Sequence, residues 1–144
     1  MKTLWTDGSA SPNPGPGGFA VIENKKPVAL GNEPHTTNIR MEAKALISAI
    51  NYAKEEGCEI YTDSQFWINV LTKWAAGWEK KGWRKSNNKP IQNPDLTQEL
   101  WRLYKTYPVK LNFVYGHQGT TENELADEWA NKARAGATIE NIKE

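Results

Sequence analysis

Cysteine and histidine are scarce in this 144-residue chain, which has one cysteine, Cys58, and two histidines. A single cysteine allows no disulfide framework and favours a reducing, cytoplasmic setting. One cysteine and two histidines are also too few for an ordinary structural zinc site. No apolar run approaches the roughly 18 residues that a membrane span needs, and the N-terminus has no signal-peptide core. We therefore expect a cytoplasmic protein without a membrane segment.

Net charge is also nearly absent, at +1, but its distribution is uneven. Residues 73–89 carry six lysines and arginines against the single acid Glu79, a local charge of +5 that leaves −4 for the rest of the chain. Three of the seven tryptophans lie in this basic segment. A basic segment on a mildly acidic body indicates a polyanionic partner that touches one region.

Length and apolar periodicity predict one α/β domain over residues 1–144, with a polar tail that frays from about residue 136. The pattern predicts strands over residues 2–6, 18–23, 27–36, 59–62 and 109–115, and helices over 40–55, 64–74, 95–104 and 122–135. Thr37 or Asn38 can cap the first helix. Gly77 and Gly82 should divide the basic segment into two short helical pieces and a projecting loop.

Two aspartates follow short apolar strands, Asp7 in Thr6-Asp7-Gly8-Ser9 and Asp63 in Thr62-Asp63-Ser64. Taken alone, Asp-Gly is more typical of a hairpin turn than of a catalytic site. However, a strand–helix–strand order makes the first and fourth strands parallel neighbours. Both aspartates would then leave the same carboxyl edge of the sheet, where open α/β sheets bind their ligands.

Two further carboxylates lie on helices, beside apolar faces. Glu42 heads the stripe that continues through Ala45, Leu46 and Ala49, and Asp127 borders the apolar face of the last helix. A first-turn glutamate is often just an exposed residue favoured by the helix dipole. On a packing face, however, a carboxylate is costly unless it is paired or binds a metal.

Four carboxylates brought together repel one another unless cations share the site. Asp7, Glu42, Asp63 and Asp127 are oxygen donors only, a set that favours Mg²⁺, with Mn²⁺ as a substitute. Two such ions can clamp the attacking and leaving oxygens of a phosphodiester displacement. The pattern thus predicts a metal-dependent nuclease.

Across nearly its whole length the chain resembles a type 1 ribonuclease H of the compact bacterial kind. The resemblance rests on six motifs: Thr6-Asp7-Gly8-Ser9, Asn13-Pro14-Gly15-Pro16-Gly17-Gly18, Thr37-Asn38 with Arg40-Met41-Glu42, Thr62-Asp63-Ser64-Gln65, residues 114–117, and Asn123-Glu124 with Asp127. It implies a five-stranded mixed sheet flanked by helices, with strands one to three antiparallel and strands four and five parallel to the first. It also implies Mg²⁺-dependent endonucleolytic cleavage of the RNA strand of RNA/DNA hybrids, leaving 5′-phosphate and 3′-hydroxyl ends, by a monomer.

By the same resemblance, Asp7, Glu42, Asp63 and Asp127 are the catalytic metal ligands. His117 would assist proton transfer or product release, and Glu124 would help metal or product exchange. A histidine near neutrality suits proton transfer. Without the resemblance, a solvated loop histidine is the better interpretation of His117, and the resemblance reverses this.

The resemblance also implies a set of substrate contacts. Short polar residues would read the RNA strand and its 2′-hydroxyls: Gly8, Ser9, Asn13, Asn38 and Gln65. Thr37 and Asn93 would hold one DNA phosphate. A basic handle at about residues 74–90 would grip the DNA strand through Trp74, Lys80, Lys81, Trp83, Arg84 and Lys85.

Some of these assignments have alternatives. Trp67 and Trp101 are expected in the core, Trp74 mostly at the interface, and Trp78 and Trp83 fit either role. Ile39 and His35 depart from the family, where a polar residue and an arginine are common, which puts hybrid affinity in doubt. The competing functions are a catalytically silent binding module, which would normally have lost one of the acids, and an integrase-like enzyme acting on DNA.

Overall fold

The computed structural model describes residues 1–115 and 121–140. The elements in chain order are β1 (Lys2–Ala10), β2 (Gly15–Glu23), β3 (Lys26–Thr36), α1 (Asn38–Ala53), η1 (Lys54–Glu56), β4 (Cys58–Thr62), α2 (Gln65–Asn69), η2 (Val70–Trp74), α3 (Ala75–Lys80), α4 (Pro94–Thr106), β5 (Val109–Phe113) and α5 (Thr121–Arg134). Within the described residues, no helix is long and apolar enough to cross a membrane.

The five strands form one mixed sheet in the order β3-β2-β1-β4-β5. β1 pairs antiparallel with β2, and β2 pairs antiparallel with β3. β4 lies parallel to β1 on the other side, and β5 lies parallel to β4. The predicted α/β fold and its strand directions are confirmed.

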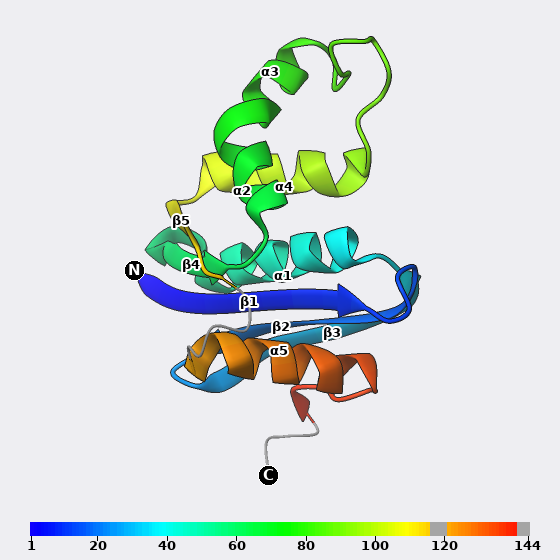
Figure 1. Ribbon diagram of the computed structural model, residues 1–144. Helices are drawn as coiled ribbons and strands as arrows, with labels where there is room; N and C mark the ends of the chain where they lie inside the picture. Colours follow the sequence, from blue (N-terminus) through cyan, green and yellow to red (C-terminus); the bar gives the residue numbers. More distant parts are fainter. Residues whose placement is uncertain (116–120, 141–144) are drawn as a thin grey trace.

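Helices cover both faces of the sheet (Figure 1). α1 packs on one face, α5 lies on the opposite face, and α4 packs against α1 on the side away from the sheet. The larger core lies on the α1 face and includes Leu4, Leu46, Ile60 and Trp67. A smaller core of Ala20, Ile22, Ala126 and Ala130 lies under α5. Small residues in α5 let this helix approach the sheet closely.

The first strand is longer than predicted. β1 does not end at Asp7, because β2 continues the antiparallel ladder through the pair Ala10↔Gly17. Residues 7–10 and 15–17, which lie between the predicted strands, are therefore strand as well, and residues 11–14 alone connect β1 to β2. The prediction that a strand ends at an aspartate is correct for β4, which stops at Thr62, and wrong for β1.

The helical predictions need two corrections. Thr37 caps α1, with its Oγ1 accepting the Arg40 N–H at 3.2 Å, so the helix begins at Asn38. Gly77 does not interrupt the basic segment, because α2, the π-helical turn η2 and α3 follow one another without a break. The chain leaves the helix only after Lys80, and Gly82 turns it with a φ of 68°.

The last strand is shorter than predicted. β5 ends at Phe113 because β4, its single pairing partner, ends at Thr62. Tyr115 lies beyond the ladder and is 70% exposed. The predicted frayed tail lies partly outside the described residues and stays a prediction. At its start, the Gly136 and Ala137 N–H groups donate to carbonyls of the last turn of α5.

Candidate active site

Asp7 lies within β1 and is only 7% exposed. The parallel register pairs Trp5 with Tyr61, so Asp7 is level with Asp63, the residue that follows β4. The Gly8 N–H donates to Asp7 Oδ1 at 2.9 Å and fixes one carboxylate oxygen. The sheet itself thus brings the two aspartates together.

Gly8 brings the third carboxylate into place. A Cβ on Gly8 would lie 2.4 Å from the Met41 carbonyl carbon and 2.7 Å from the Glu42 nitrogen. Only glycine therefore lets the first turn of α1 rest directly on β1. Glu42 follows this contact in α1, and its carboxylate lies beside that of Asp7.

Asp63 is held at the start of α2. The Ser64 N–H donates to Thr62 Oγ1 at 3.1 Å, and Ser64 Oγ caps the helix by accepting the Trp67 N–H at 3.3 Å. Trp67 is fully buried, as predicted, and its Nε1–H donates to the Ile39 carbonyl oxygen at 2.8 Å. This contact joins α2 to the start of α1, so Asp63 and Glu42 are held by connected elements.

One oxygen from each of Asp7, Glu42 and Asp63 lies within 4.8 Å of the other two. Glu42 Oε1 and Asp63 Oδ1 are buried, and neither accepts a hydrogen bond from the described residues. Buried carboxylate oxygens without donors are costly, and a bound cation would satisfy them. The donor set is oxygen only and fits Mg²⁺ or Mn²⁺.

Burial and neighbouring negative charge both disfavour ionisation in this cluster, and both raise the pKa values of its acids. Burial, with the nearby charges of Asp63 and Asp127, raises the pKa of Asp7 from 3.8 to about 8. Burial raises the pKa of Glu42 well above its ordinary value, with Asp7 and Asp63 adding to the rise. A cation bound between these acids would offset both effects and favour their ionised forms.

The fourth acid, Asp127 on α5, lies beside this cluster rather than inside it. Its carboxyl is close enough to Asp7 to raise the pKa of that residue. It does not belong to the group whose oxygens all lie within 4.8 Å. Glu124 is exposed in the first turn of α5. His117 lies outside the described residues, so its role stays a prediction.

Predicted RNA-side residues join the β1–β2 connection to the start of α1. Asn13 Oδ1 accepts the Asn38 N–H at 3.1 Å, and Asn38 Oδ1 accepts the Ala10 N–H at 2.7 Å. Ser9 lies in β1 opposite Gly18, and Gln65 is exposed at the first residue of α2. In the sequence these residues lie near the acids of the cluster: Ser9 follows Asp7, Asn38 precedes Glu42, and Gln65 follows Asp63.

Thr37 and Asn93 were predicted to hold one DNA phosphate. Both side chains line the same pocket, which has a volume of about 530 Å³. Asn13, Pro14, Ile39 and Gln92 complete its lining. Asn93 has a left-handed backbone, with φ 51° and ψ 52°, and its Oδ1 accepts a hydrogen bond from Arg40 Nη1 at 3.1 Å. Arg40 also donates to both Asp95 oxygens, at 2.9 and 3.2 Å.

The handle presents aromatic and basic side chains in a surface groove of about 440 Å³. Its lining consists of Lys73, Trp74, Gly77, Trp78, Lys81, Lys85 and Ser86. Trp74 is 39% exposed, and its ring centroid lies 5.8 Å from that of Trp78. We call this surface the handle groove.

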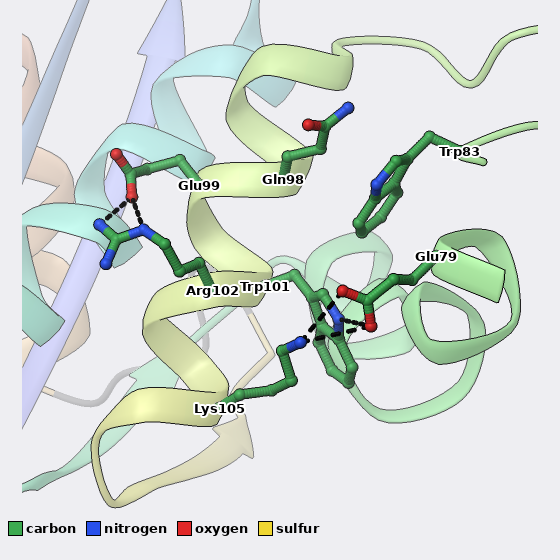
Figure 2. Close-up of a pocket in the computed structure, with 7 residues that line it drawn as sticks. All are labelled: Glu79, Trp83, Gln98, Glu99, Trp101, Arg102 and Lys105. Atoms are coloured by element: carbon green, nitrogen blue, oxygen red, sulfur yellow. Dashed lines mark hydrogen bonds and ion pairs between the residues drawn. The ribbon is translucent and has the colours of Figure 1, made fainter.

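Other predicted handle residues lie elsewhere. Trp83 lines a second pocket between α3 and α4 (Figure 2), and it packs against the larger core. The backbone of Arg84 forms an isolated antiparallel β-bridge with that of Pro90. Its side chain donates to the Asn88 carbonyl oxygen at 3.2 Å, so Arg84 stabilises the loop. Lys80 is exposed at the end of α3. Trp101, expected in the core, is half-buried at its edge.

The sequence patterns missed two interactions around these sites. One is the contact of Arg40 with Asn93 and Asp95, which lie more than 50 positions after Arg40 in the chain. The other is the contact of Glu79 with Trp101 and Lys105. Arg40 stands in a quoted motif, but no spacing rule links it to its distant partners.

A family model described as RNase H matches residues 1–135. The chain belongs to the RNase H family. This range contains every carboxylate of the cluster and the whole sheet. Membership makes the protein a nuclease of the ribonuclease H class, whose members cleave RNA in RNA/DNA hybrids.

Curated bacterial relatives agree with this assignment. The chain is 46% identical over 135 residues to the Ribonuclease H of Agrobacterium fabrum (strain C58 / ATCC 33970), covering 90% of this chain and 91% of the relative. It is 42% identical over 144 residues to the Ribonuclease H of Alkalilimnicola ehrlichii (strain ATCC BAA-1101 / DSM 17681 / MLHE-1), covering 93% and 98%. The resemblance to a bacterial ribonuclease H is confirmed.

Solved structures show the same fold. LC9-RNase H1, described as a type 1 RNase H with the type 2 active-site motif, aligns with a TM-score of 0.73 and 25% identity, over 96% of this chain and 74% of its own. A foamy viral protease-reverse transcriptase, solved in complex with RNA/DNA hybrid, aligns with a TM-score of 0.75 over 94% of this chain and 20% of its own. At 17% identity, the second likeness concerns the fold alone.

Proposed function

We propose that this RNase H hydrolyses the RNA strand of RNA/DNA hybrids at the Asp7 cluster in the presence of Mg²⁺, leaving 5′-phosphate and 3′-hydroxyl ends. One observation carries the proposal. Asp7, Glu42 and Asp63 offer oxygens within 4.8 Å of one another, and two buried oxygens of this set lack donors among the described residues. Buried carboxylates with no partner at all would only destabilise the fold. A bound cation, by contrast, requires several carboxylate oxygens close together.

Asp7, Glu42 and Asp63 would hold two cations, with Asp127 completing the set beside Asp7. The cations would stabilise the charge on the attacking and leaving oxygens of the phosphodiester. The chain itself fixes the ligands: the Gly8 N–H orients Asp7, and Ser64 caps the helix that follows Asp63. In this proposal His117 takes up or delivers a proton near the reacting phosphate, and Glu124 assists exchange at the rim.

Residues around the cluster would recognise the two strands differently. The RNA strand would lie along Gly8, Ser9, Asn13, Asn38 and Gln65, where short polar groups can contact 2′-hydroxyls across a wide minor groove. Ile39 is 37% exposed at this surface and presents an apolar side chain there.

One phosphate of the DNA strand would enter the pocket of Thr37 and Asn93. The polar lining of this pocket, from Asn13, Gln92 and Asn93, supplies the amide donors that a phosphate oxygen accepts. Ile39 contributes an apolar wall. His35, the other departure from the family, is exposed on β3.

The handle groove would contact the DNA backbone farther along the duplex. Lys73, Lys81 and Lys85 surround the exposed Trp74 ring, a combination that neutralises phosphates and packs against sugars. Lys80, Arg84 and Trp83 belong to the proposed handle as flanking charge and support. Affinity through this surface should fall as salt rises.

We further propose that residues 1–144 act as one monomeric domain in the cytoplasm. The handle, at residues 74–90, belongs to this domain because α2 and η2 connect it directly to the core at Trp67 and Val70. Mn²⁺ should substitute for Mg²⁺, since the ligands are carboxylate oxygens.

The deciding assay compares RNA/DNA, RNA/RNA and DNA/DNA duplexes of one sequence, with Mg²⁺, with Mn²⁺ and with chelator. The proposal expects cleavage of the RNA strand of the hybrid alone, and only with a divalent cation. Binding without cleavage would favour a silent binding module, and cleavage of DNA/DNA would favour an integrase-like enzyme. Either result would refute the proposed function.

A further inference from the structure

Glu79 is the single acid of the basic segment, and it does not belong to the handle groove. Its carboxylate points from α3 toward α4 (Figure 2). Glu79 Oε1 accepts the Trp101 Nε1–H at 3.0 Å, and Lys105 Nζ lies 3.1 Å from Oε2 and 3.3 Å from Oε1. Both partners are residues of α4.

The α4 side of this contact is held by further packing. Trp101 packs against the larger core and stacks on Tyr104, with ring centroids 6.0 Å apart. Lys105 Nζ lies 5.1 Å from the centroid of the Trp101 ring. Glu79, Trp101 and Lys105 thus each contact the other two. The half-buried Trp101 ring, which packs on the core, anchors this group.

The Glu79 side chain spans the space between α3 and α4. Close backbone contact between this region and α4 comes from η2, one turn earlier in the chain. Between α3 and α4 lies a pocket of about 460 Å³, lined by Glu79, Trp83 and Trp101 among others. The start of α3 is fixed by the unbroken helix from η2 and by the buried Ala75, whereas toward its end side-chain contacts link α3 to α4. Within the described residues, the polar links that cross from α3 to α4 are those of Glu79.

We infer that Glu79 is a positioning residue, which fastens α3 to Trp101 and Lys105 of α4 and so sets the direction of the handle groove toward the hybrid. The inference rests on the proposed function. α3 also carries Trp78, and Lys81 and Lys85 lie in the segment after it, so a change in the angle of α3 moves these groove residues. Glu79 touches no part of the proposed substrate path and acts through α3.

Charge alone predicts the opposite effect. An acid in a phosphate-binding segment repels the DNA backbone, so its removal should tighten binding. If Glu79 positions the groove, its removal weakens binding instead. The direction of the change in KM therefore separates the two readings.

The experiment compares Glu79→Ala and Glu79→Gln with the matched control Glu99→Ala. Glu99 lines the same pocket, but its ion pair with Arg102 lies within α4, so the control removes an acid without cutting the link to α3. Two readouts are taken: KM and kcat on an RNA/DNA hybrid with Mg²⁺, and amide hydrogen exchange of α3 in the free protein.

Glu79→Ala should raise KM by roughly threefold or more with kcat within about twofold, and should speed exchange in α3. Glu79→Gln retains an oxygen that can accept the Trp101 N–H, so its KM should fall between those of the parent and Glu79→Ala. Glu99→Ala should match the parent in both readouts.

An unchanged or lowered KM for Glu79→Ala would overturn the positioning role, as would a fall in kcat at constant KM. Unchanged exchange in α3 would overturn the link itself. A parent protein that cuts no hybrid would refute the proposed function alone, because the exchange comparison would still decide whether Glu79 holds α3 on α4.

Discussion

The backbone of Gly8 in β1 rests directly on the backbone of Glu42 in α1, with no room for a side chain between them. A Cβ at position 8 would lie 2.7 Å from the Glu42 nitrogen. This contact lets a strand and a helix present Asp7 and Glu42 to the same point. The geometry of the acidic cluster therefore depends on a glycine as well as on the acids.

Gly8→Ala should separate α1 from β1 and move Glu42 away from Asp7. Overpacking of this kind costs about 1–3 kcal/mol, and the displaced ligand should lower kcat as well. Urea unfolding and hybrid cleavage measure the two effects.

Gly77→Ala is the matched control for stability. Position 77 lies in a helix with open space around it, so alanine there should stabilise the protein by about 0.5–1 kcal/mol. A Gly8→Ala protein as stable and as active as the parent would show that α1 and β1 can separate without consequence.

Divalent cations should stabilise the folded protein through Asp63 and its neighbours. A ligand that binds only the folded state adds about 2.7 kcal/mol at a hundredfold excess over its Kd. The Tm of the parent should rise with Mg²⁺ concentration, and Asp63→Asn should lose most of this rise. The control Glu128→Gln breaks an exposed ion pair with Lys132 on α5, outside the cluster. This variant should keep the rise in Tm. Equal Mg²⁺ responses in both variants would argue against the cluster as the cation site.

The raised pKa of Asp7 predicts a pH dependence of stability in chelator. The unfolded chain releases this proton near 3.8, whereas the folded protein holds it to about 8. Between these values the folded state binds more protons, so the free energy of unfolding should fall as pH rises from 5 to 8. Asp7→Asn removes the titrating group, and its decline should be shallower.

Urea unfolding at several pH values, with chelator present, checks this sign. Asn has nearly the shape of Asp, so the comparison isolates the charge. A parent whose stability rose over the same range would contradict the assignment. So would an Asp7→Asn protein with the same slope as the parent.

Arg40 should position Asn93 in the proposed phosphate pocket. Its guanidinium donates to Asn93 Oδ1 and to both oxygens of Asp95. Arg40→Met should free the Asn93 side chain and raise the KM for hybrid by roughly threefold to tenfold, with little change in kcat. Arg102→Met, which removes an arginine paired with Glu99 within α4, is the matched control. A parent-like KM for Arg40→Met would remove Arg40 from substrate recognition.

Local patterns predicted most of the fold, because they report periodicity and chain order. The alternation of strand and helix fixed the parallel pairing of β1 with β4, and the Glu42 stripe placed its carboxylate on the packed face. Element ends were less predictable. β1 runs to Ala10 because β2 pairs with it there, and no pattern within residues 2–10 contains that information.

The cluster was predictable and its supporting contacts were not. Asp7 and Asp63 follow short strands that the chain order pairs, so their proximity follows from topology. Arg40 with Asn93, and Glu79 with Trp101, join residues that tertiary packing alone brings together. Trp83 shows the same limit, since the sequence left it open between core and interface, and packing places it in the pocket beside α4.

The most direct test of the central claim is the rate of hybrid cleavage by Asp7→Asn with saturating Mg²⁺. The account predicts a loss of at least about a hundredfold in kcat, since metal ligands supply several kcal/mol of charge stabilisation. Binding of the hybrid should stay measurable, because the handle groove and the Thr37 pocket are intact. An Asp7→Asn protein that cuts the hybrid as fast as the parent would contradict the account.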